Sequence, residues 1–157
     1  MSLVKRALPQ PGDAGAVAAR FAAQLAVHTD VHDVAADLEA GVDGLVIIDS
    51  RPYENWRQGH LPGAVPMRAA SVATDAARIV PASGVVVTYG WGPACDSGTR
   101  AAEQFALLGY PVKEMLGGYE YWVRRGLPVR TPKGLVRSWP DPMTGPVPAS
   151  PASGDVR

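Results

Sequence analysis

The only cysteine of the chain, Cys95, lies in the stretch VVVTYGWGPACDSGTRAAEQFALLGY, residues 85–110. This stretch predicts a buried strand, a glycine-rich loop and a helix, and a loop at a helix N-terminus can bind an anion through its backbone N–H groups. The segment Cys95–Arg100 has the spacing C-x-x-G-x-R. Backbone N–H groups and a nearby arginine would stabilise a thiolate and lower the thiol pKa. Cys95 is therefore a candidate nucleophile.

Two neighbours of Cys95 argue against a reactive thiol. Asp96 places a carboxylate beside the sulfur, which disfavours the thiolate. Arg100 directly precedes Ala101-Ala102, where the predicted helix is already under way, so Cys95 could belong to the first helical turn and miss the N–H groups. A single cysteine is more often structural than nucleophilic, and the reactive thiol and the inert loop cysteine remain alternatives.

Polar residues follow two predicted strands of this chain. Ligands of open parallel α/β sheets bind beyond the carboxyl ends of the strands. After the strand expected at 85–89, we expect the substrate to contact Gly90, Trp91, Gly92, Ser97, Gly98, Thr99 and Arg100. After the first strand, 45–48, we expect structural support from Asp49, Arg51, Glu54 and His60. Hydrogen bonds and ion pairs that brace the loops are favoured there over direct chemistry.

Other kinds of site fit these residues less well. Gly90-Trp91-Gly92 after a strand is similar to a dinucleotide loop, but Cys95 stands at the third glycine position. A cysteine phosphatase would need C-x5-R, one residue more than is present. His28 and His32 have the spacing of metal ligands, but no third ligand is evident, so we expect no metal and no cofactor.

The composition excludes several classes of partner. The 157 residues suit one domain, and the 15 basic and 15 acidic residues cancel. Nucleic-acid binding would need a basic excess, and no apolar run approaches the roughly 18 residues that span a bilayer. We therefore expect neither nucleic acid nor membrane as a partner. The N-terminus lacks an apolar signal region, and one cysteine suits a reducing cytoplasm.

Strand and helix patterns alternate along the chain. Apolar runs predict strands at 45–48, 62–67, 85–89 and 111–116, and periodicity predicts helices at 13–27, 30–40, 69–79, 97–108 and 119–125. This alternation predicts an α/β domain with a mainly parallel sheet. We expect a leader and the start of the first helix at 1–19, the domain at 20–130 and a Pro/Gly/Ser-rich tail at 131–157.

Side chains at three places test this assignment. Val17, Phe21 and Leu25 should form the inward face of an amphipathic first helix, with Asp13 as its cap. The tail lacks periodicity and should be flexible alone. If it is ordered, Trp139 and Met143 should dock on the domain or on a partner chain.

Several segments together resemble the rhodanese-like domain family. DSRPYENWRQGHLPGAVPM is similar to the family's D-x-R, E and G-H-L-P-G-A elements, and VVVTY to its central strand. RAAEQFALLGYPVKEMLGGYEYWVRRGLPV resembles its last helices and L-G-G turn. The resemblance covers about residues 20–130. It implies a doubly wound α/β fold and sulfur transfer from thiosulfate or a similar donor to a thiophilic acceptor, through a cysteine persulfide.

The family's cysteine follows the central strand directly, and here that position is Gly90. Three hypotheses follow from this departure. Cys95 could carry the persulfide, with a small sulfur-containing anion or a thiol as its partner. Alternatively, the chain is a catalytically inactive module that binds an anion or a partner protein. The third hypothesis is a redox sensor that forms mixed disulfides through Cys95.

Overall fold

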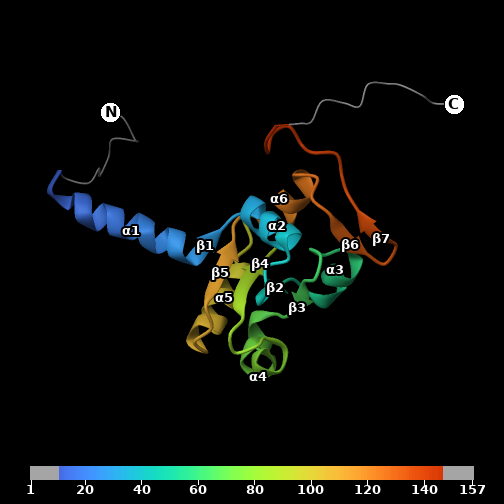
Figure 1. Cartoon of the computed structure of the whole chain (residues 1–157), viewed down its shortest axis with the longest axis horizontal. Coiled ribbons are helices and arrows are strands. Elements are labelled where there is room, and N and C mark those ends of the chain that lie inside the picture. The colour runs from blue at the N-terminus through green and yellow to red at the C-terminus, as the bar shows by residue number, and fades with distance from the viewer. Residues whose placement is uncertain (1–10, 147–157) are drawn as a thin grey trace.

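A five-stranded parallel sheet with strand order β1-β5-β4-β2-β3 organises the computed structural model, which describes residues 11–146 (Figure 1). The strands are β1 (His28–Thr29), β2 (Leu45–Asp49), β3 (Val65–Pro66), β4 (Val85–Tyr89) and β5 (Val112–Met115). The helices are α1 (Ala14–Val27), α2 (Val31–Ala40), α3 (Tyr53–Gln58), α4 (Ala69–Ile79), α5 (Ser97–Leu107) and α6 (Gly118–Arg124). A 3-10 turn, η1 (Pro11–Asp13), precedes α1, and an antiparallel hairpin of β6 (Val129–Thr131) and β7 (Gly134–Val136) follows α6.

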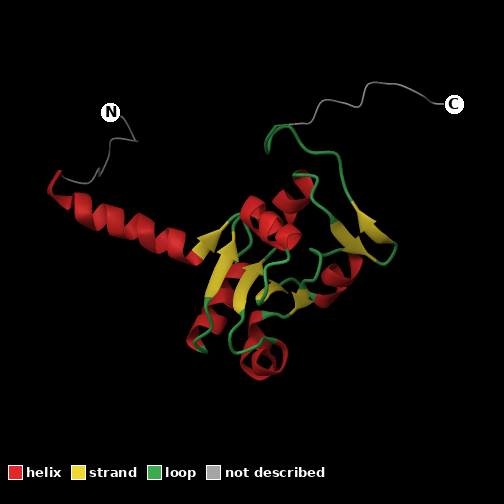
Figure 2. Cartoon of the chain, in the orientation of Figure 1, coloured by secondary structure: helices red, strands yellow, loops and turns green. Residues whose placement is uncertain are grey.

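The sheet lies between two groups of helices (Figure 2), and a cluster of apolar side chains fills the space on each of its faces. Alternate residues of a strand point to opposite faces, so Ile47 and Val87 pack with α2 and α6, while Ile48 and Val86 pack with α4 and α5. Trp122 of α6 lies in the first cluster and is 1% exposed. Helices on both faces of a parallel sheet make the predicted α/β architecture, and the prediction is confirmed.

The two apolar runs at the centre of the sequence are neighbours in the sheet. β2 and β4 pair in parallel along their whole length, from Leu45 with Val85 to Asp49 with Tyr89. Neither is an edge strand. The sequence did not predict β1, α3 or the β6–β7 hairpin, because each has at most six residues and too few positions to show a period.

Local signals explain why α2 begins and ends where it does. The Asp30 carboxylate accepts hydrogen bonds from the backbone N–H groups of His32 and Asp33, at 2.8 and 3.0 Å. These contacts satisfy N–H groups that have no partner inside the helix. Gly41 ends the helix with a φ of 64°, a left-handed conformation that glycine adopts without strain.

Helix α1 has the predicted bounds but not the predicted packing. It projects away from the sheet (Figure 1), and none of its residues is buried. Phe21 is 61% and Leu25 72% exposed, so the expected inward face meets no core. Asp13 is the N-cap residue, but its side chain makes no capping hydrogen bond. The periodicity predicted the helix correctly, but it could not show whether the apolar face of that helix packs against the rest of the domain.

The segment 137–146 is attached to α6 by polar contacts, while its two largest apolar side chains are exposed. Arg124 binds the Asp141 carboxylate at 2.8 Å, and Arg125 donates to the Thr144 carbonyl at 2.6 Å. Trp139 is 59% and Met143 86% exposed, so they do not dock on the domain, and the alternative of docking on a partner chain stays a prediction. The rest of the predicted tail and the first ten residues of the leader lie outside the described residues.

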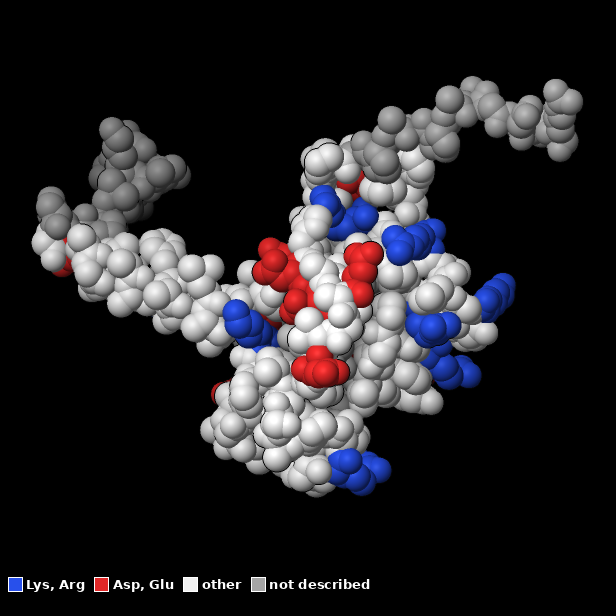
Figure 3. Space-filling model, in the orientation of Figure 1, with Lys and Arg blue, Asp and Glu red and all other residues white. Residues whose placement is uncertain are grey.

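Charged side chains are unevenly spread on the face shown in Figure 3. Acidic side chains gather near its middle, around the position of α2, and most Lys and Arg side chains lie toward its rim. Helix α2 itself contains Asp33, Asp37 and Glu39. Within residues 11–146 there is no helix with the length and apolar character that a membrane span requires.

Candidate functional site

The candidate site begins where β4 ends. Tyr89 is the last strand residue, and the loop Gly90–Asp96 connects it to α5, which begins at Ser97. Cys95 therefore precedes the helix by two residues and is not part of its first turn. The Cys95 N–H donates to the Gly92 carbonyl at 3.0 Å, which folds the loop back over the end of the strand.

Gly90 and Cys95 are neighbours in space. A Cβ placed on Gly90 would lie 3.2 Å from Cys95 Sγ and only 2.5 Å from Ser97 Oγ. The space that a side chain at position 90 would need is thus filled by the cysteine sulfur and the serine hydroxyl. A Cβ at position 90 would therefore have to displace one or both of them.

Hydrogen bonds around Cys95 favour its thiolate. Burial raises the pKa of the thiol, but the Ser97 hydroxyl and the backbone N–H groups of Ser97 and Trp91 lower it by more, while Asp96 raises it slightly. The resulting pKa lies below the ordinary thiol value. Ser97 Oγ is 3.2 Å from Cys95 Sγ, and the sulfur is partly exposed, so a reagent can reach it.

The turn before α6 presses against the cysteine loop. Gly117 and Gly118 have φ angles of 86° and 57°, and a Cβ on Gly118 would lie 2.6 Å from the Gly90 carbonyl oxygen. The close approach lets Tyr119 N–H donate to the Gly90 carbonyl at 2.9 Å and Glu120 N–H to the Trp91 carbonyl at 2.8 Å. The L-G-G segment therefore fixes the backbone of the cysteine loop.

A buried ion pair lies under the same loop. Arg51 and Asp49 are 1% and 0% exposed and are joined by side-chain hydrogen bonds as short as 2.6 Å. The second Asp49 oxygen also accepts from the Tyr89 hydroxyl. Burial raises the pKa of Tyr89 well above its usual value, and Asp49 raises it further, so this hydroxyl stays protonated as a donor.

Arg51 links the two loops that follow β2 and β4. Its Nη2 donates to the Gly59 carbonyl at 2.7 Å, and its Cζ lies 3.9 Å from the Tyr119 ring centroid and 4.6 Å from that of Trp91. Cation–π contacts of this kind are strongest when water is excluded. The Gly59–Ala64 turn and the cysteine loop thus share one edge of the sheet.

Three of the residues predicted for the site lie elsewhere. Arg100 is exposed on α5, and its guanidinium binds the Asp96 carboxylate at 2.8 Å. Glu54 is exposed on α3 and makes no ion pair with a described residue. His60 Nδ1 donates to the Trp56 carbonyl at 2.7 Å, and the His60 ring stacks on the Trp56 ring.

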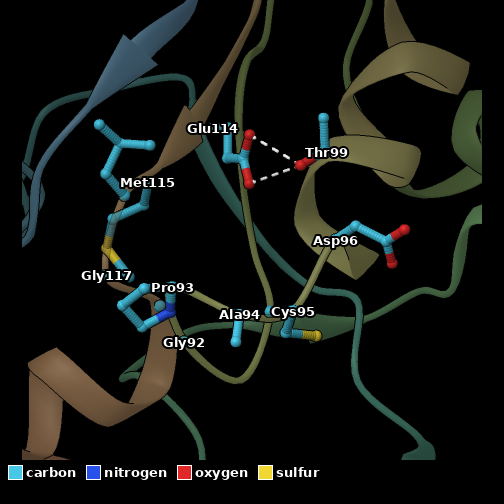
Figure 4. Close-up of a pocket in the computed structure, with 12 residues that line it drawn as sticks. Gly92, Pro93, Ala94, Cys95, Asp96, Thr99, Glu114, Met115 and Gly117 are labelled. Carbon is cyan, nitrogen blue, oxygen red and sulfur yellow. Dashed lines mark hydrogen bonds between the residues drawn. The ribbon is translucent and has the colours of Figure 1, made fainter. Parts of the chain in front are cut away.

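A pocket of about 350 Å³ opens beside the cysteine loop (Figure 4). Predicted residues that line it are Gly90, Gly92, Cys95 and Thr99. Residues that were not predicted also line it, and these are Pro93, Ala94, Asp96, Glu114, Met115, Leu116, Gly117 and Gly118. Pro93, Ala94 and Asp96 belong to the cysteine loop itself. The signal for residues 114–118 was the carboxyl end of β5, which reaches the same edge as β4 because the two strands are parallel.

Comparisons with known proteins identify the fold and its family. The model of the rhodanese-like domain family matches residues 17–125. The crystal structure of the BH2092 protein from Bacillus halodurans is similar with a TM-score of 0.72 and 33% identity, over 80% of this chain and 89% of that one. The rhodanese-like domain of the Anabaena sp. Alr3790 protein shares the fold, with a TM-score of 0.60 and 23% identity over 83% and 92%.

A curated relative is a regulator. The HTH-type transcriptional regulator Rv0324 of Mycobacterium tuberculosis is 31% identical over 85 residues, which are 54% of this chain. The match spans only 37% of the regulator's length. Fold, sequence match and the arrangement of the two loops lead to one assignment: the chain belongs to the rhodanese-like domain family.

Proposed function

We propose that this protein transfers sulfane sulfur through a persulfide on Cys95. One observation carries the proposal: Cys95 Sγ lies 3.2 Å from the point where a Cβ of residue 90 would stand. The family resemblance implies a nucleophilic cysteine directly after the central strand, at position 90. The sulfur from position 95 reaches the same place from the other side of the loop.

The groups around the sulfur suit nucleophilic attack. The Cys95 thiolate attacks the outer sulfur of thiosulfate, the S–S bond of the donor breaks, and sulfite leaves with the bonding electron pair. Cys95 then holds the transferred sulfur as a persulfide. A thiolate acceptor attacks that outer sulfur and releases the Cys95 thiolate again. The Ser97 hydroxyl and the Trp91 and Ser97 N–H groups stabilise the negative sulfur at both stages.

A silent binding or regulatory module is the second candidate. Its supporting observation is Gly90, which leaves the family's usual position without a thiol. The match to part of a transcriptional regulator points the same way. In that case the fold would present its pocket to an anion or a partner protein without transferring sulfur. Both candidates include a cytoplasmic location, since a reducing compartment keeps a lone thiol free.

Mass spectrometry of the intact protein separates the two candidates. After incubation with a sulfane donor, thiosulfate or an organic hydropersulfide, the transferase should gain the mass of one sulfur atom, and reduction should remove it. Because Cys95 is the only cysteine, Cys95→Ser must abolish the gain. A wild-type protein that gains no sulfur from either donor while remaining folded would favour the silent module.

A further inference from the structure

The charges of the cysteine pocket differ from those expected of an anion site. Its lining includes two carboxylates, Asp96 and Glu114, and none of the residues that line it is Lys or Arg. Figure 4 shows Glu114 facing Thr99 beside the cysteine loop. An anionic donor such as thiosulfate would have to enter a pocket that already carries negative charge.

Glu114 occupies the place where an external anion would bind. Its oxygens accept from Thr99 Oγ1 at 2.9 and 3.1 Å, and its side chain is 16% exposed. A Cβ on Gly98 would lie 3.2 Å from Glu114 Oε1, so the carboxylate lies against the first turn of α5. The positive end of the helix dipole is thus already compensated by the protein's own carboxylate.

The basic side chains near the pocket either pair with other carboxylates or lie at the limit of ion-pair distance. Arg100 binds Asp96 at 2.8 Å and lines a separate pocket with Arg68. Among the described residues, only His28 comes within ion-pair distance of Glu114, with Nε2 4.0 Å from Oε2. Glu120, whose carboxylate lies at Gly92 on the rim, is paired with Arg124 at 3.0 Å. Among the carboxylates at this pocket, Glu114 is therefore the one without an arginine or lysine partner in the described part of the chain.

The geometry points to a pocket that selects uncharged and cationic sulfur compounds over anions, with Glu114 as the specificity-determining residue. This inference rests on the proposed function where it concerns sulfur transfer. The donor class is then a neutral or amine-bearing hydropersulfide, R–S–SH. The Cys95 thiolate attacks its outer sulfur, the donor S–S bond breaks, and R–S⁻ leaves with the electron pair, so that Cys95 gains one SH group and becomes the persulfide Cys–S–SH.

Charge selectivity can be measured without sulfur transfer. Three methanethiosulfonates carrying trimethylammonioethyl, methyl or sulfonatoethyl groups modify thiols with loss of methanesulfinate, and each rate on Cys95 is divided by that on 2-mercaptoethanol. We expect the order cation, neutral, anion, with roughly threefold or more between the extremes at low salt. The ratio should collapse at about 1 M salt, where the Debye length falls to about 3 Å. An anion that reacts as fast as the cation overturns the inference.

Two glutamate variants locate the responsible charge. Glu114→Gln should bring the cation-to-anion ratio close to that of the free thiol. Glu103→Gln is the matched control, because Glu103 lies on α5 outside the cysteine pocket and its loss should leave the ratio unchanged. Equal effects of the two variants would contradict the role of Glu114. Reporting ratios cancels any common change in the reactivity of the thiol.

Persulfide donors test the same selectivity in the proposed reaction. The hydropersulfides of cysteamine, 2-mercaptoethanol and 3-mercaptopropionate differ in the headgroup charge, and thiosulfate adds a dianion. We expect faster gain of one sulfur atom from the cation than from either anion. No gain from any donor, with cation preference kept toward the methanethiosulfonates, would reject sulfur transfer and support the pocket's charge selectivity. Gain from all donors at equal normalised rates would support sulfur transfer and reject the selectivity.

Discussion

Asp49 and Arg51 after β2 and Cys95 after β4 lie at the same edge of the sheet, yet the solvent reaches only the sulfur. The ion pair is 0–1% exposed and each partner has several hydrogen bonds. Cys95 is partly exposed and has one side-chain partner, Ser97. A buried charge without its partner is costly, so the first loop must be rigid. The second loop can leave its reactive atom open because the turn before α6 holds its backbone, through hydrogen bonds to the Gly90 and Trp91 carbonyls.

The largest effect is expected when the rigid loop loses its counter-charge. Asp49→Asn leaves the Arg51 guanidinium buried without a carboxylate and should lower the free energy of unfolding by about 3–5 kcal/mol. Urea unfolding followed by circular dichroism measures the loss. Asp75→Asn is the matched control, because the Asp75–Arg78 pair is exposed and should contribute about 0–1 kcal/mol. Similar losses for both variants would break the contrast between the two loops.

A methyl group at Gly90 tests how tightly the open loop packs. Its carbon would start 2.5 Å from Ser97 Oγ and 3.2 Å from Cys95 Sγ. Gly90→Ala should cost about 1–3 kcal/mol, as overpacking does, and should slow alkylation of Cys95 because its hydrogen bonds are displaced. Gly15→Ala is the control, since nothing lies within 4 Å of its added Cβ. Unchanged stability and thiol reactivity in Gly90→Ala would contradict the close approach of residues 90 and 95.

A Ser97 variant tests whether the hydrogen bond from Ser97 stabilises the Cys95 thiolate. Ser97→Ala removes a donor that lowers the pKa of Cys95, so the pKa should rise and the thiolate fraction at neutral pH should fall. Alkylation by iodoacetamide near pH 7 should slow by roughly two- to tenfold, the range of a net hydrogen bond. Wild type should show its half-maximal rate below the ordinary thiol pKa, and the variant closer to it. Identical pH profiles of wild type and variant would contradict the stabilisation of the Cys95 thiolate by Ser97.

The smallest effects belong to the exposed pair on α5. Asp96→Asn should slightly speed alkylation, because Asp96 raises the pKa of Cys95. Arg100→Ala should slightly slow it, because the freed carboxylate of Asp96 is no longer neutralised at 2.8 Å. Each change should stay within about threefold, as expected for exposed charges. The double variant should lie near wild type, and a large effect in the double variant would show that the pair acts on the loop by another route.

Local and long-range features of this chain were predictable to different degrees. Apolar runs located β2 and β4 and their polar ends, because a strand buried on both faces needs uninterrupted apolar residues. The approach of Cys95 to Gly90 was not predictable, since it depends on Gly118, which contacts the loop from another part of the chain. Glu114 was missed because it stands inside a short strand, where only the register with β4 brings it to the pocket.

Arg100 illustrates the opposite error. Its spacing from Cys95 was right for a loop that surrounds an anion, but spacing does not tell which carboxylate a guanidinium will meet. The i,i+4 position on α5 placed Asp96 within 2.8 Å, and this local pair took the charge that was expected to serve the pocket. The C-x-x-G-x-R motif therefore located the cysteine loop, but it did not predict the net charge of the pocket.

Because α1 is exposed, its local unfolding and the global unfolding of the sheet should have different free energies. No side chain of its 14 residues is buried, and isolated helices of this length are marginal in water. The helix can therefore unwind while the sheet stays intact, and its amide hydrogens should exchange with deuterium through this local opening. The amides of β4, central in the sheet, should exchange only when the whole domain opens. Denaturants should accelerate exchange in β4 steeply and in α1 hardly at all, so one global unfolding free energy does not describe every residue.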